Sequence, residues 1–275
     1  MPQNPNIKFE PPPKLSELGR DLLELTPGQR VLTLALPFIF AGMYFYAAFT
    51  SHWLIAVASV VYLSFVTYGS TSHDLVHCNL GLSKRTNEIF LALIELLALR
   101  SGHAYRMAHL HHHAHFPDED DIEAAAAKRS AWGALLEGTT FHFRLWRWAL
   151  KRAQGPARKL ILAEGWAACL LIIISLLLCR TTLVPLIYVL LVTTGAWITP
   201  LVTSYIPHDA SGKNELEQTR VFRGRLLSII AVEHLYHLEH HLYPAIPHQN
   251  WPRLSRRLDP YFDRVGIKPV QLGRK

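Results

Sequence analysis

Residues 31–73 read VLTLALPFIFAGMYFYAAFTSHWLIAVASVVYLSFVTYGSTSH and contain no Asp, Glu, Lys or Arg. At about 1.5 Å per helical residue this stretch is roughly 65 Å long, enough for two crossings of a bilayer core. Thr50, Ser51 and His52 place polar groups near its middle. The stretch therefore predicts two spanning helices, about 31–50 and 53–73, with a turn around residues 50–53.

A second apolar pair follows later in the chain. Residues 160–179 are interrupted only by Glu164, and residues 183–206 carry no charge. The sequence thus predicts four transmembrane helices in two hairpins. A shorter apolar run at 89–99 contains Glu95 and is too short to cross, so it predicts a re-entrant or surface-lying helix.

The composition agrees with a membrane protein. Hydrophobic residue types make up 50% of the 275 residues and charged types 18%, which argues against a disordered, fibrous or ordinary soluble protein. The net charge is +7, so the basic groups must lie between the apolar stretches. Cys78, Cys169 and Cys179 are too few and too scattered for a disulfide framework, a zinc ribbon or an iron–sulfur cluster.

The distribution of basic residues predicts the orientation. Of the 28 Lys and Arg residues, 4 lie in residues 1–30, 12 in 74–159, one is Arg180 and 11 follow residue 206. If both hairpin turns face outward, all but Arg180 lie on one side, which the positive-inside rule assigns to the cytoplasm. We expect residues 1–30 to be a cytoplasmic N-terminal tail rather than a signal peptide, and 31–275 to be a single membrane domain.

The chain has 16 histidines, and most of them fall in three clusters, two of which lie in its first half. In HDLVH at 73–77, His73 and His77 fall on one face of a helix. In HLHHH at 109–113, His109, His112 and His113 fall within an arc of roughly 100°, and His111 points to the other side.

The third cluster is HLEHH at 237–241, where His237, His240 and His241 repeat this spacing before Pro244 and Pro247 end the helix. One such cluster is equally well explained by solvated or hydrogen-bonded imidazoles. Three clusters at one membrane face favour a metal site. An all-imidazole shell suits iron, copper or zinc, and eight ligands predict two ions with open positions.

The motifs HDLVH, HLHHH and HLEHHLYP (237–244) resemble the three histidine boxes of the membrane fatty acid desaturase superfamily, which includes carotenoid ketolases and hydroxylases. The resemblance covers residues from about 31 to 258. It implies an all-α integral membrane fold whose cytoplasmic helical cap holds the boxes. It also implies a non-haem diiron centre that activates O2 and cuts an unactivated C–H bond in a lipid chain.

The resemblance further implies a ninth ligand from outside the boxes. His208, in the Pro207-His208 pair at the end of the fourth span, resembles the segment that carries this ligand in related enzymes. His234 lies three residues before His237 on nearly the same helical face. We favour His208, with His234 as a hydrogen-bond donor to the third box.

No electron carrier is recognisable in the sequence, which has no glycine fingerprint for a dinucleotide and no cysteine set for a cluster. The resemblance therefore implies a separate ferredoxin, cytochrome b5 or flavoprotein reductase, and no nucleic acid partner. The basic cytoplasmic surface would suit an acidic carrier or anionic lipid head groups.

Other candidate residues have less defined roles. The acidic run of Asp118, Glu119, Asp120, Asp121 and Glu123 is explained either as a solvated loop or as a set of carboxylates that orient imidazoles. The remaining candidates are expected to be hydrogen-bonding, surface or membrane-anchoring groups: His52, His103, His115, His142, His248, Trp132, Trp146 and Trp148.

The most plausible activity is fatty acyl desaturation. The alternative is a carotenoid ketolase or hydroxylase at the same type of centre, since the acidic run and Pro207-His208 also resemble carotenoid ketolases. A histidine-rich metal transporter is a remote alternative. It would need ionisable residues inside the spans, where the sequence offers only Glu164.

Overall fold

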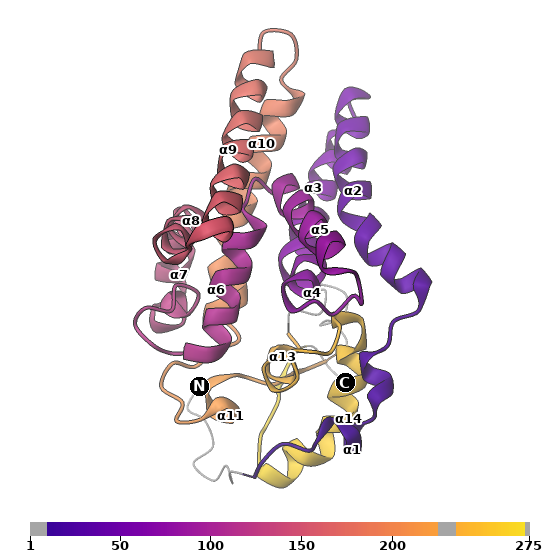
Figure 1. The fold of residues 1–275 in the computed structure, drawn as a ribbon, viewed down its shortest axis with the longest axis vertical. Coiled ribbons are helices and arrows are strands. Elements are labelled where there is room, and N and C mark those ends of the chain that lie inside the picture. The colour runs from indigo at the N-terminus through magenta and orange to yellow at the C-terminus, as the bar shows by residue number, and fades with distance from the viewer. Residues whose placement is uncertain (1–9, 225–234, 273–275) are drawn as a thin grey trace.

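The structure is a computed structural model that describes residues 10–224 and 235–272, and it is mostly helical (Figure 1). Four segments are long and apolar enough to cross a membrane: Arg20–Phe49, Trp53–His77, Gly155–Leu178 and Val184–Tyr205. They match the four predicted spans. The first and third begin earlier than predicted and the second ends later, because each includes helical turns beyond the apolar core of the span.

The first two spans contain α2 (Pro27–Phe49) and α3 (Trp53–Val66), which pack along each other. The sequence marks the start of α2 with a capping box: Gln29 N donates to the Thr26 hydroxyl and Thr26 N donates to the Gln29 side chain. Pro27 occupies the first helical position, where its missing N–H costs nothing. The connection lies at residues 50–52, within the predicted turn.

Beyond α3 the second span continues through a π-helical turn, η2 (Thr67–Thr71), into α4 (Ser72–His77). The hydroxyl of Thr71 donates to the Thr33 carbonyl at 2.9 Å, which ties this turn to α2. Single π-turns inside α-helices often occur at functional sites. Here the turn leads directly into the first histidine motif, and His73 is buried.

The last two spans contain α9 (Gly155–Leu178) and α10 (Val184–Gly195). Two short turns, η4 (Ala196–Ile198) and η5 (Leu201–Tyr205), extend α10 toward the histidines. Tyr44 of α2 donates its hydroxyl hydrogen to the Val184 carbonyl at 2.7 Å. The buried tyrosine thus connects the two pairs of spans without leaving a polar group unpaired.

Between the two pairs of spans lie α5 (Lys84–Leu97), α6 (Gly102–His115), η3 (Ala124–Lys128), α7 (Ala131–Gly138) and α8 (Phe141–Arg152). α5 covers most of the predicted short apolar run and is not among the segments long enough to cross. It packs against α2, α4, α6 and α9. Its Glu95 is buried and forms an ion pair with Arg100, whose Nε lies 2.8 Å from the carboxylate.

Glu164, the carboxylate inside the third span, has a structural explanation. It accepts hydrogen bonds from the Ser101 hydroxyl at 2.5 Å and from His103 N at 3.1 Å, and His103 Nδ1 lies 2.6 Å away. His103 Nε2 lies 2.6 Å from Glu88. Burial alone would lower the pKa of His103, but the two carboxylates raise it. Glu164 therefore joins α9 to α6.

After the fourth span the chain forms a cap at one end of the helices (Figure 1). Its elements are α11 (Glu215–Gln218), β1 (Phe222–Arg223), α13 (His237–Leu242), η6 (His248–Asn250), α14 (Trp251–Val265) and β2 (Val270–Gln271). β1 and β2 pair in parallel, with Phe222 opposite Val270. α13 ends before Pro244, as predicted.

The described part of the predicted N-terminal tail packs onto this cap. α1 (Leu15–Leu18) and η1 (Arg20–Leu23) bury Leu18 and Leu22 against α14. Asn250 Nδ2 donates to the Leu22 carbonyl at 2.9 Å and to the Glu24 carbonyl at 3.0 Å. Residues far apart in sequence thus close one side of the cap.

Candidate metal centre

The three histidine motifs lie on α4, α6 and α13, and the structure brings them together with His208, which follows η5. Nine imidazoles form two groups, and within each group the candidate ligand atoms lie within 4.8 Å of one another. The five-histidine group contains His73, His77, His109, His113 and His240, and the four-histidine group contains His112, His208, His237 and His241. These are the nine side chains that were predicted as ligands.

In the five-histidine group the Nε2 atoms converge. His109 Nε2 lies 3.1 Å from His73 Nε2 and 3.1 Å from His113 Nε2. His240 Nε2 lies 2.8 Å from His113 Nε2. His77 joins them with its ring centroid 4.9 Å from that of His240. The first motif thus contributes both of its histidines, as its spacing predicted.

The four-histidine group is centred on His208. Its Nε2 lies 3.2 Å from His112 Nε2, 3.1 Å from His237 Nε2 and 3.3 Å from His241 Nε2. His208 is 1% exposed, so its Nε2 is shielded from bulk solvent. The competing ligand candidate, His234, lies outside the described residues.

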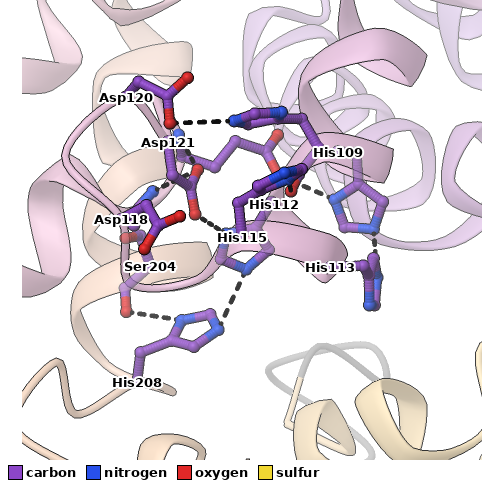
Figure 2. Close-up of polar contacts among 12 residues, drawn as sticks. His109, His112, His113, His115, Asp118, Asp120, Asp121, Ser204 and His208 are labelled. Atoms are coloured by element: carbon purple, nitrogen blue, oxygen red, sulfur yellow. Dashed lines mark hydrogen bonds and ion pairs between the residues drawn. The ribbon is translucent and has the colours of Figure 1, made fainter.

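The second motif divides between the two groups (Figure 2). His109 and His113 are one helical turn apart and enter the five-histidine group, whereas His112 enters the four-histidine group. Successive residues of a helix are separated by about 100°, so neighbours His112 and His113 point toward adjacent groups. His111 points away, as predicted: its Nε2 lies 3.3 Å from Asp120 and its ring stacks on His115.

Two carboxylates of the acidic run hold imidazoles of the second motif (Figure 2). Asp121 Oδ2 lies 2.8 Å from His112 Nδ1, and Glu123 Oε2 lies 2.8 Å from His109 Nδ1. When Nδ1–H donates to a carboxylate, the Nε2 lone pair faces the group. The orienting explanation therefore applies to Asp121 and Glu123. Asp120 is half-exposed and pairs with Arg152, as expected of a solvated loop residue.

The arrangement of nitrogens fits a cation. His208 Nδ1 donates to the Ser204 carbonyl at 3.0 Å, which leaves its Nε2 as a lone pair. Three other Nε2 atoms surround this lone pair. A single acceptor atom cannot form good hydrogen bonds with all three of them. In the five-histidine group, the buried His77 Nε2 has no hydrogen-bond partner among the described residues. A metal ion bound within each group would accept the lone pairs of these nitrogen atoms and so satisfy them.

Electrostatics favour the metal-binding form of most of these imidazoles. Burial and the neighbouring imidazoles lower the pKa of His208, His237, His240 and His241, so they stay neutral. A neutral imidazole is the form that ligates a metal. His112 differs: burial alone would lower its pKa, but the hydrogen bond and charge of Asp121 raise it.

One supporting contact was not predicted. Asp74, between the two histidines of the first motif, accepts from His248 N at 3.0 Å, and its other oxygen lies 2.6 Å from His248 Nδ1. The first motif is thereby tied to η6 of the cap. Asp74 was visible in the sequence, but its partner lies 174 residues away, a separation that no local pattern reports.

A small chamber beside the imidazoles shares two lining residues with an apolar groove. Tyr68 and Thr203 line both. The groove has a volume of about 300 Å³ and lies between α3 and the segment from α10 to η5, with Val61, Phe65 and Ile198 in its walls. The hydroxyl of Tyr68 donates to Glu123 at 2.8 Å, so the wall of the groove is linked to an orienting carboxylate.

Comparison with known proteins supports the same family as the motifs. The sequence model of the family described as fatty acid desaturase matches residues 30–272, which include most of the first span, the other three spans and all three motifs. None of the curated proteins compared with the chain matches it. Because the matched region covers most of the chain, the protein belongs to the fatty acid desaturase family.

Proposed function

We propose that this protein is an O2-dependent, non-haem diiron oxidoreductase that introduces a double bond into a fatty acyl chain. The observation that carries the proposal is the presence of two imidazole groups, one of five histidines and one of four, in a member of the desaturase family. Diiron centres are known in this family, and the nine histidines are the proposed ligands.

Two iron ions held by these imidazoles would supply the oxidising power to remove hydrogen from an unactivated C–H bond with O2. Conversion of a –CH2–CH2– unit to –CH=CH– with reduction of O2 to two waters consumes two further electrons and two protons. A separate donor of electrons is therefore part of the proposal. A ferredoxin, a cytochrome b5 or a flavoprotein reductase has the required chemistry.

The chain's own residues would position the substrate and the imidazoles. The apolar groove at Val61, Phe65 and Ile198 suits a hydrocarbon chain, and it shares the lining residues Tyr68 and Thr203 with the histidine chamber. The apolar walls of the groove would keep water away from the methylene groups of the acyl chain. Asp121 and Glu123 would hold the rings in their ligand orientation.

The proposal is tested with purified protein and with lipids. We expect two iron ions per chain and an O2-dependent and reductant-dependent increase in unsaturated acyl chains, measured by elemental analysis and mass spectrometry. An active preparation with stoichiometric zinc and no iron would contradict the diiron proposal. Oxygenated carotenoids with unchanged acyl chains would identify the ketolase or hydroxylase alternative instead, and metal uptake that needs neither O2 nor reductant would identify a transporter.

We also propose that the histidines and both termini face the cytoplasm, on the basis of the distribution of basic residues. The test uses single cysteines in a background where Cys78, Cys169 and Cys179 are replaced by Ser. A membrane-impermeant maleimide added to intact cells should label Ser51→Cys but not Lys84→Cys or Lys128→Cys. The reverse labelling pattern would invert the orientation.

A further inference from the structure

The net positive charge of the chain lies in one segment. Residues 128–159 contain eight Lys or Arg and one Glu, whereas the rest of the chain contains 20 basic and 20 acidic residues. The one carboxylate, Glu137, is buried and paired with Arg129 and Arg144. The other basic side chains of the segment are exposed: Lys128, Arg147, Lys151, Arg152, Arg158 and Lys159.

The same segment exposes large apolar side chains. Trp132 and Leu136, one turn apart on α7, are 75% and 67% exposed, and Phe143 on α8 is 62% exposed. On α8, Arg147 and Lys151 follow Phe143 at four-residue spacing and so share its face. The opposite face of α8, which includes Leu145, is buried. Basic and apolar side chains on one exposed helix face are typical of a helix that lies in the membrane interface.

The packing of α8 places it at the required depth. Trp146 Nε1 donates to the Ile161 carbonyl of α9 at 3.0 Å, and a methyl group at Gly165 would lie 2.7 Å from that nitrogen. Ile161 and Gly165 lie about 9 and 15 Å along the third span from its first residue. α8 also packs on α6, which carries the second histidine motif. α8 therefore lies beside the first turns of a span, at the end where the histidines gather.

We propose that the exposed surface of α7 and α8, formed by Trp132, Leu136, Phe143, Arg147 and Lys151, binds anionic phospholipid head groups of the surrounding bilayer. The basic side chains attract the head groups, and the apolar side chains enter the acyl boundary beneath them. An acidic protein would meet the same charge. The three exposed apolar side chains and the depth of α8 favour lipid.

The test measures lipid retention and needs neither metal nor turnover, so its failure is distinguishable from failure of the proposed oxidoreductase function. Full-length protein is purified from vesicles of equal phosphatidylcholine and phosphatidylglycerol, and the retained lipids are quantified by mass spectrometry. We expect the wild type to retain phosphatidylglycerol preferentially. The preference should fall about fivefold for each charge that is removed, so R147Q/K151Q should reduce it roughly 25-fold.

The matched control is R256Q/K268Q, which removes two exposed charges from the cap and should keep the wild-type preference. A second measurement keeps the native charge: Trp132→Phe should remove part of the tryptophan fluorescence that brominated phosphatidylglycerol quenches. No preference in the wild type, equal loss in both double variants, or unchanged quenching in Trp132→Phe would overturn the proposal. Unchanged lipid preference in R147Q/K151Q with weakened binding of an acidic electron carrier would also overturn it, and would assign the surface to a protein.

Discussion

The two histidine groups differ in how the chain builds them. The five-histidine group takes a contribution from each of the three motifs, and no other residue among those that the structure describes joins it. The four-histidine group takes nothing from α4 and is completed by His208, which follows η5. One group is therefore assembled by the motifs alone, whereas the other depends on where the fourth span ends.

Their supporting contacts differ as well. In the five-histidine group, His109 is held by Glu123, which is linked in turn to Tyr68 at the groove. In the four-histidine group, His112 is held by Asp121 and His208 by the Ser204 carbonyl. Because a carboxylate or carbonyl behind an imidazole tunes its basicity, we expect two ions bound here to be inequivalent.

The largest expected effect comes from removal of one ligand from each group. His240→Ala removes an imidazole from the five-histidine group and His112→Ala one from the four-histidine group. Turnover should be lost in both, since the proposed chemistry needs both ions, and iron analysis should show about one iron per chain rather than two. Activity in either variant close to that of the wild type would show that its group is dispensable.

The dependence of the four-histidine group on the fourth span is tested by two further variants. His208→Ala should lose one iron and turnover, because His208 Nε2 lies within 3.3 Å of three other ring nitrogens. His234→Ala should keep both irons. If His208→Ala kept two irons and normal activity while His234→Ala lost one, the assignment of the ninth ligand would be reversed.

The two supporting carboxylates should have intermediate effects, each confined to its own group. Glu123→Gln and Asp121→Asn keep the side-chain shape but weaken the hydrogen bond to one imidazole, so each should lower metal affinity or turnover by about 10- to 100-fold. Metal titration with Mössbauer spectroscopy would show which iron is affected. Asp120→Asn is the control, and an effect as large in this variant would remove the distinction between orienting and solvated carboxylates.

The smallest effect should come from His111→Ala. This imidazole lies in the second motif but contacts Asp120 and His115 rather than either group. Turnover should stay within about twofold of the wild type, as for most partly exposed side chains away from a site. A loss as severe as that of His112→Ala would place His111 among the ligands.

Local patterns were sufficient for the spans and for the membership of the motifs. A long charge-free run of apolar residues crosses a membrane as a helix, because its backbone polar groups must be paired within the segment. Residues at i, i+4 spacing on a helix share a face, as His73 and His77 do. The same reasoning separated His111 from its neighbours. It did not assign His112 and His113 to different groups, because their 100° separation is compatible with one ion or two until the positions of α4 and α13 are known.

Contacts between distant segments were beyond the sequence patterns. The link between Asp74 and His248 joins residues 174 apart, a separation that lies outside any helical or strand spacing pattern. The N-terminal segment was interpreted as a tail because charged and proline residues dominate its sequence. Its apolar residues Leu18 and Leu22 become buried by packing against α14, which lies more than 200 residues later. Such pairings depend on tertiary packing, which periodicity does not report.

The contact of Asn250 with the Leu22 carbonyl spans 228 residues, which sets an order of events during synthesis. At about 5 to 20 residues per second, roughly 11 to 46 s pass between translation of the two partners. All four spans can enter the membrane in that interval. During it, the N-terminal segment of α1 and η1 and the first two motifs lack their partners in α13 and α14. We expect arrested nascent chains that end before residue 237 to be cleaved by protease within residues 10–25, and full-length chains to be protected there. Metal loading would then be the last step of biogenesis, after the ribosome has passed the third motif.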